Sequence, residues 1–214
     1  IVLLEAEAGY GKSRLTEDFV QTIRSEAVSL YQAAADAIES ATPHFAIREL
    51  LIDVLNIDSQ VASSDLRQQI SELLVEREFV ELMPLLSSII PLELPESAFT
   101  EQIEGEARAH QTARLVVEII KRSRGSEATV IILEDTHWMD SASWGIVATL
   151  AREVSPLLLM LVTRPVSEPT KEMNQLLSVA SLEHIKMDRM SESDILKLVC
   201  TRLGVRSLPD LVAR

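Results

Sequence analysis

Short apolar runs alternate with segments of helical periodicity along most of the chain. Continuous runs of β-branched and aliphatic residues are typical of buried strands, and apolar positions repeating every three or four residues are typical of amphipathic helices. The pattern predicts strands at residues 1–6, 27–35, 128–135 and 157–163, with a weaker strand at 182–187. It predicts helices at residues 12–25, 44–57, 64–77, 78–90 and 104–124, and two more that begin near Ser141 and Ser191.

The order of these elements predicts an α/β fold. Strands that are apolar throughout, such as ATVIILED at residues 128–135, are typical of a parallel sheet that helices cover on both faces. Asp140 is the expected N-cap of the helix that follows this strand. The helical stretch from 44 to 124 is long for one crossover, so we expect it to be an insertion after the second strand.

Charge and composition narrow the classes of partner. The 214 residues carry a net charge of −13, so a general basic field for binding nucleic acid is missing. The single cysteine, Cys200, excludes an internal disulfide and favours a reducing, cytoplasmic compartment. Its apolar neighbours in the sequence predict a core thiol.

No apolar run reaches the ~18 residues of a membrane span. Because the chain starts at Ile1 inside an apolar run, we expect it to be part of a longer protein.

The segment AEAGYGKS, from Ala6 to Ser13, contains most of a phosphate-binding loop. The full pattern is G-x-x-x-x-G-K-[ST], and only its first glycine is replaced, by Ala6. Backbone amides of residues 9–13 can point at phosphates from a helix N-terminus. Lys12 can reach the β- and γ-phosphates, and the Ser13 hydroxyl can bind Mg²⁺. The candidate nucleotide-binding residues are Ala8, Gly9, Tyr10, Gly11, Lys12, Ser13 and Arg14.

The same loop could be a glycine-rich turn that binds nothing. A strand before the loop and a helix after it are the context that the motif requires, and both are predicted here, so the binding interpretation is favoured. Alanine at the first position keeps a small side chain but gives up the freedom to take a positive φ. We therefore expect Ala6 to be tolerated, with weaker binding.

A second candidate site lies at the end of the strand 128–135. Glu134 and Asp135 stand side by side there, where a phosphate-loop protein needs an acid near its Mg²⁺. One carboxylate would hold the metal together with Ser13, and Glu134 is the candidate for that role. The other would orient or activate the attacking water. The alternative is a pair of surface acids at a strand end, which the phosphate loop makes the weaker interpretation.

The stretch LEDTHWMDSASW resembles the signature of STAND-type, AAA-like ATPase modules, which is an apolar run followed by Asp-Asp-x-His-Trp-x-Asp. His137, Trp138 and Asp140 match this signature, and LVTRP at 161–165 is similar to the sensor-1 strand of the family. The resemblance implies a P-loop NTPase fold of the ASCE type that binds ATP and Mg²⁺. It also implies that Arg164 senses the γ-phosphate. His137 and Trp138 either position the acidic loop or are purely structural, and neither is expected to be a catalytic base.

Three departures from the family pattern bear on activity. Ala6 replaces a glycine, and Glu134 stands where the family usually has Asp. The later Gly-Asn-Pro segment does not occur, so residues 1–214 are expected to be a domain fragment without its C-terminal lid segment.

Two further stretches, TPHFAIRELL and GEARAHQTARLV, are similar to modules fused to class III adenylate or guanylate cyclases. The predicted function is a regulatory ATP switch that hydrolyses slowly, linked to a cyclase-like output domain. The alternatives are a nucleotide-binding scaffold that never hydrolyses, or a protein-interaction domain, in a LuxR-type transcriptional regulator. An oligomer is compatible with the pattern, and no direct contact with nucleic acid or membrane is expected.

Overall fold

The central element is a parallel sheet. The computed structural model describes residues 1–57 and 63–206. These residues form a five-stranded sheet with the strand order β2-β3-β4-β1-β5, and every neighbouring pair is parallel. The strands are β1 (Val2–Glu5), β2 (Val28–Ala34), β3 (Ala128–Glu134), β4 (Leu157–Thr163) and β5 (Glu183–Lys186). The sheet confirms the predicted α/β class, and the acidic strand β3 lies next to β4, the neighbour of β1.

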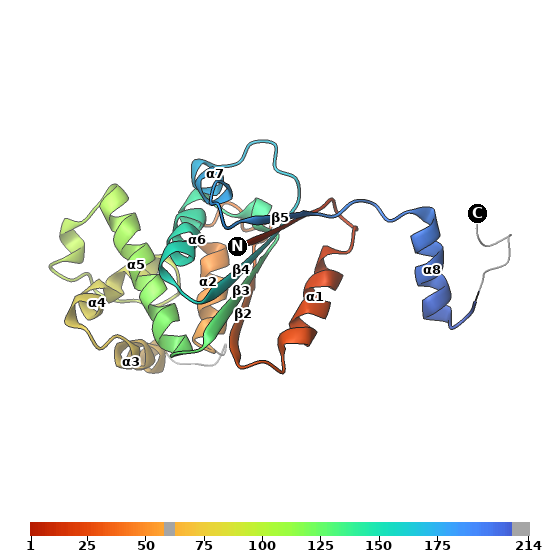
Figure 1. Cartoon of the computed structure of the whole chain (residues 1–214). Helices are drawn as coiled ribbons and strands as arrows, with labels where there is room; N and C mark the ends of the chain where they lie inside the picture. Colours follow the sequence, from red (N-terminus) through yellow and green to blue (C-terminus); the bar gives the residue numbers. More distant parts are fainter. Residues whose placement is uncertain (58–62, 207–214) are drawn as a thin grey trace.

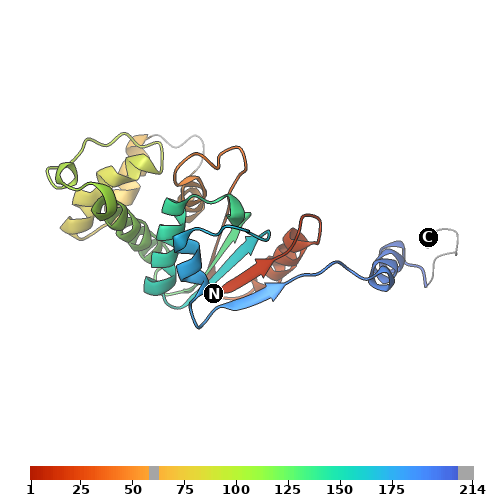
Figure 2. The same ribbon diagram turned by 90° about the horizontal axis from the view of Figure 1, so that it is seen from above.

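The two faces of the sheet are covered differently (Figures 1 and 2). Helix α1 (Lys12–Ile23) covers one face, where Val20 packs on Leu4, Ile132 and Val162. The other face carries a larger core beneath the helices that follow β2, β3 and β4. Alternate residues of the strands point to opposite faces, which explains why the central strands β3, β4 and β1 are largely apolar, whereas the exposed edge strand β5 is polar. The helices over the larger core are α2 (Phe45–Val54), α5 (Gly105–Arg124), α6 (Ser141–Glu153) and α7 (Lys171–Leu177).

The chain between β2 and β3 is helical in its described parts. Besides α2 and α5 it contains α3 (Ser63–Leu73), α4 (Arg77–Leu82) and the 3-10 helices η1 (Met83–Ser88) and η2 (Thr100–Gln102). The prediction of one helix over 78–90 is wrong, because α4 ends at Leu82 and a 3-10 helix follows. Pro84 has no N–H to donate, and its ring clashes with the preceding turn of an α-helix.

The C-terminal part of the described chain extends away from the sheet. Helix α8 (Glu192–Leu203) follows β5, lies apart from the other helices (Figure 1) and has no buried residue. Ser191 caps it, and the Ser191 hydroxyl accepts from the Asp194 amide at 3.2 Å. The prediction of a core thiol is wrong, because Cys200 lies on this helix and is only half-buried. Among the described residues, none of its apolar neighbours on α8 is buried or belongs to the hydrophobic core. A search of the same residues finds no helix that could span a membrane.

Candidate functional site

The phosphate loop connects the carboxyl end of β1 to the first turn of α1. Gly9 and Gly11 both take a positive φ, of 80° and 91°, and Gly11 is the N-cap residue of the helix. A Cβ atom at either glycine would meet no other atom within 4 Å, so it is the backbone conformation and not space that requires glycine there. Within the described residues, no backbone carbonyl accepts from the amides of Gly11, Lys12 and Ser13. These amides are free to bind an anion at a helix N-terminus.

Two side chains of this loop form its described hydrogen bonds: Lys12 bonds within the loop itself, and Ser13 reaches β3. The Lys12 ammonium is buried and donates to the carbonyl oxygens of Ala6 and Glu7 at 2.8 and 3.0 Å. The Ser13 hydroxyl donates to a carboxylate oxygen of Glu134 at 3.3 Å, although the two residues are 121 positions apart. The fold thus brings together the serine and the acid that the sequence predicts as metal ligands. Whether they bind a metal remains a prediction.

The replaced first glycine has a simple structural explanation. Ala6 is 4% exposed, and its amide donates to the Thr163 carbonyl of β4 at 3.2 Å. Ala6 is not among the residues with a positive φ. Alanine therefore costs no backbone strain at this position, and its methyl group adds to the core.

Asp135 follows β3 in a strained conformation. Its φ of 51° and ψ of 36° are left-handed, which aspartate tolerates better than most residues. Its side chain is 45% exposed, and no hydrogen bond to its carboxylate is found in the described part of the chain. Left-handed residues other than glycine often occur at functional sites, where the surrounding structure holds them. Asp135 is thus held by its backbone while its carboxylate stays free to act.

The segment after Asp135 is the 3-10 helix η3 (Thr136–Trp138). The buried Thr136 hydroxyl donates to the Val162 carbonyl of β4 at 3.3 Å. The side chain of His137 is 9% exposed, and its ring lies 4.8 Å from that of Trp138. Both ring nitrogens of His137 are buried without a hydrogen-bond partner in the described structure.

Burial and three charged groups act on the pKa of His137. Burial lowers the pKa of His137, so the ring is neutral near pH 7. The Asp135 carboxylate opposes this shift, and the positive charges of Arg164 and Lys12 add to it. The Nδ1 atom lies 3.9 Å from an Asp135 carboxylate oxygen. His137 therefore feels the charges of candidate residues in the phosphate loop, directly after β3 and directly after β4, and of these Asp135 has a contact distance.

The remaining predicted residues lie at the surface. Arg164 follows β4, is exposed, and forms no ion pair or side-chain hydrogen bond within the described residues. Arg14 is not brought to the acidic strand, because its guanidinium pairs with Glu17 at 3.6 Å and with Asp18 at 2.9 Å along α1. Tyr10 is half-buried, and Ala8 is exposed.

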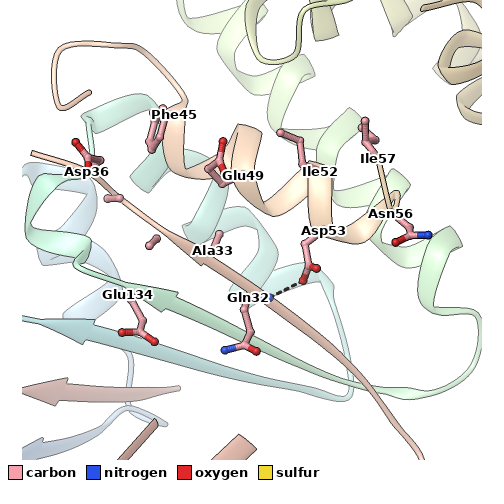
Figure 3. A pocket seen from close by; sticks show the side chains of 12 residues that line it. Gln32, Ala33, Asp36, Phe45, Glu49, Ile52, Asp53, Asn56, Ile57 and Glu134 are labelled. Atoms are coloured by element: carbon pink, nitrogen blue, oxygen red, sulfur yellow. Dashed lines mark hydrogen bonds between the residues drawn. The ribbon is translucent and has the colours of Figure 1, made fainter. Parts of the chain in front are cut away.

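A cavity of about 610 Å³ lies beside this site, at the free edge of β2 (Figure 3). Its lining includes Asp36, Glu49, Asp53 and Glu134, and the backbone N–H of Gln32 donates to the Asp53 carboxylate at 2.8 Å. No lysine or arginine of the described chain lines it. Phosphate would be repelled by such an acidic lining, so the loop after β1 stays the predicted phosphate site. Glu134 of β3 belongs to the cavity lining and also accepts from Ser13 of that loop.

Comparison with known proteins assigns the family. The AAA ATPase domain family matches residues 1–162, more than half of the chain. The chain belongs to the AAA ATPase domain family. This assignment and the sheet topology confirm the predicted AAA-like P-loop ATPase fold, and the family implies nucleotide binding.

Several relatives are similar to this AAA ATPase domain at low identity. Adenylate cyclase type 10 of Mus musculus is 23% identical over 217 residues, and that of Homo sapiens is 20% identical over 209 residues. The alignments cover 98% and 96% of this chain, which spans only 13% of the length of either relative. A chain in a solved structure of Drosophila ORC bound to DNA aligns with a TM-score of 0.45 and 13% identity, covering 95% of this chain and 41% of that one.

Sequence reasoning did not single out two features of the AAA ATPase domain. One is the left-handed backbone of Asp135, and the other is the pair of unpartnered nitrogens on His137. The spacing of two residues between Asp135 and His137 was a signal for their proximity, since a tight turn after a strand brings such residues together. The sequence alone does not show whether the His137 ring is buried or whether its nitrogens have hydrogen-bond partners.

Proposed function

We propose that this AAA ATPase domain binds Mg-ATP, hydrolyses it slowly and acts as a regulatory switch within a larger protein. The hydrogen bond from Ser13 to Glu134 is the observation that carries the proposal, because it joins the free amides at the start of α1 to the acidic end of β3. An incoming Mg²⁺ prefers hydroxyl, carboxylate and phosphate oxygens, and this pair supplies the first two.

Each residue has a distinct part in the proposed reaction. The amides of Gly11, Lys12 and Ser13 bind phosphate oxygens, and the Lys12 ammonium leaves its two carbonyl partners to contact the β- and γ-phosphates. Mg²⁺, when bound to Ser13 and Glu134, would neutralise charge on the phosphates. Asp135 orients the attacking water, and Arg164 contacts the γ-phosphate.

The proposed switch role assumes that the site belongs to a longer protein. Segments that contact the γ-phosphate become ordered around it and are released when it is lost. The matched relatives are named as adenylate cyclases and are far longer than this chain, which favours a linked cyclase-like output domain. We expect the protein to act in the cytoplasm, with no direct contact to nucleic acid or membrane.

Hydrolysis is tested by phosphate release with Mg-ATP from the wild type and from Asp135→Asn. The variant keeps the size of the side chain but loses the carboxylate that orients water. We expect its rate to fall by about 10²-fold or more. Asp65→Asn, on α3 in the helical layer between β2 and β3, is the matched control and should keep the wild-type rate.

The outcomes separate the switch from its alternatives. A wild type that releases no phosphate but is stabilised by Mg-ATP would identify a nucleotide-binding scaffold. If Asp135→Asn hydrolyses as fast as the wild type, Asp135 does not orient the water and its proposed role is wrong. A wild type that neither hydrolyses nor responds to nucleotide would instead be a protein-interaction domain.

A further inference from the structure

The buried ring of His137 has an unusual environment. Its side chain is 9% exposed, and neither nitrogen has a hydrogen-bond partner in the described structure. Leaving a buried polar group unpaired destabilises a folded protein. Nearly all buried polar groups in native proteins are paired, so this ring calls for an explanation.

A direct contact with the nucleotide does not explain this ring. Both nitrogens are shielded from solvent, whereas a group that binds phosphate has to face the open site. Lys12 and Arg164 lie close enough to lower the pKa of His137, and as cations they cannot accept a hydrogen bond from it. Trp138 offers a ring face at 4.8 Å and no acceptor atom in the indole.

Of the charged groups that act on the ring, only the Asp135 carboxylate can accept a hydrogen bond. Its Oδ1 atom lies 3.9 Å from Nδ1 of His137, about 1 Å beyond hydrogen-bond length. The backbone of Asp135 is fixed in a left-handed conformation, and its half-exposed side chain has no hydrogen bond of its own within the described residues. A hydrogen bond between the two groups requires the Asp135 side chain to rotate toward the ring. A neutral imidazole with its proton on Nδ1 then donates to the carboxylate.

We propose that His137 is a positioning residue that donates a hydrogen bond from Nδ1 to Asp135 and fixes the carboxylate toward the attacking water. The inference rests on the proposed hydrolysis, because it gives His137 a task only when Asp135 orients water. The bond fixes the orientation of one oxygen and leaves the other free to accept from the water, so His137 acts on the rate of hydrolysis and not on nucleotide binding.

This role predicts opposite effects on stability and on rate for His137→Phe. Phenylalanine fills the same space without two unpaired nitrogens, so the unfolding midpoint should stay equal or rise. Without the donor, Asp135 is free to rotate, and kcat should fall about 10- to 100-fold, as is typical when an outer-shell partner is lost. KM and the stabilisation by Mg-ATP should be unchanged. A packing role for the ring predicts no change in kcat.

Two further variants identify the nitrogen that acts. His137→Asn places an amide N–H close to the position of Nδ1 and should keep kcat within a few-fold of the wild type. His137→Gln places its amide N–H closer to the position of Nε2 and should lose activity as the phenylalanine variant does. All four proteins are compared by steady-state phosphate release and by thermal unfolding with and without Mg-ATP.

The result that overturns the inference is an unchanged kcat in His137→Phe while the wild type hydrolyses and Asp135→Asn does not. Equal loss in the Asn, Gln and Phe variants would also overturn it, since the Nδ1 donor would then have no special part. If the wild type itself does not hydrolyse ATP, the proposed function fails and the inference falls with it. The wild-type assay distinguishes that case from the first two.

Discussion

Ala6 and Gly11 show how much each position of the phosphate loop constrains its residue. Ala6 has an ordinary backbone conformation, and its methyl group is buried. Gly11, at φ 91°, is in a conformation that residues with a Cβ rarely adopt. The loop therefore depends on its later glycines, and the missing first glycine is not a defect in this structure.

A glycine at position 6 should destabilise the fold without improving nucleotide binding. We expect Ala6→Gly to lower the free energy of unfolding by about 1 kcal/mol, through lost burial and a more flexible unfolded chain, with no tighter binding of Mg-ATP. Chemical denaturation and a nucleotide titration of the variant measure the two effects. A clear gain in affinity would show that Ala6 does impair the loop.

Gly11→Ala should have a different outcome from the same substitution at Gly145. At Gly11 the left-handed backbone makes alanine cost about 1–2 kcal/mol, and the loop amides should lose their orientation and their affinity for phosphate. Gly145 lies within α6, has no positive φ, and an added Cβ there meets nothing within 4 Å. Gly145→Ala should therefore stabilise the fold by about 0.5–1 kcal/mol. Equal effects at both positions in thermal unfolding would contradict this account.

At the scale of elements, Asp140 joins two segments behind the site. Its carboxylate accepts from the Ser143 amide at 3.0 Å and from the Ser143 hydroxyl at 2.6 Å, which caps α6 as predicted. It also accepts from the His44 amide at 3.0 Å, just before α2 begins. One side chain thus fixes the start of α6 and the start of the helical layer, directly after the acidic loop.

Removal of the Asp140 cap should lower the stability of the whole domain. We expect Asp140→Ala to lower the free energy of unfolding by about 1–2 kcal/mol, or roughly 2–8 °C in the midpoint for a chain of this size. Ser191→Ala removes the corresponding cap of α8, which buries no residue, and should leave the main transition unchanged. If the two variants shift the midpoint equally, the assignment of α8 to a separate, weakly packed position is wrong.

At the scale of the whole molecule, periodicity predicted the strands and most helices, because their apolar positions directly reflect burial against the sheet. Periodicity gave a wrong prediction for the helix over 78–90 and for the burial of Cys200. Pro84 stands in a 3-10 helix where an α-helix was predicted, and Cys200 is only half-buried on a helix that buries none of its residues in the described structure. The sequence motifs predicted Lys12, Ser13 and Glu134 as parts of one site. The hydrogen bond from Ser13 to Glu134 is visible only in the folded structure. The unpaired state of His137 could not be predicted, because it depends on which atoms are missing around the ring.

The central claim is that this domain binds Mg-ATP through the loop after β1, and thermal unfolding with and without Mg-ATP tests it most directly. Ligand at about 100 times its dissociation constant adds ~2.7 kcal/mol, which corresponds to a rise of several degrees. We expect that rise in the wild type and in Lys121→Ala, whose lysine pairs with Glu153 at the other end of the sheet, and not in Lys12→Ala. The absence of a shift in the wild type, or an equal shift in Lys12→Ala, would contradict the claim.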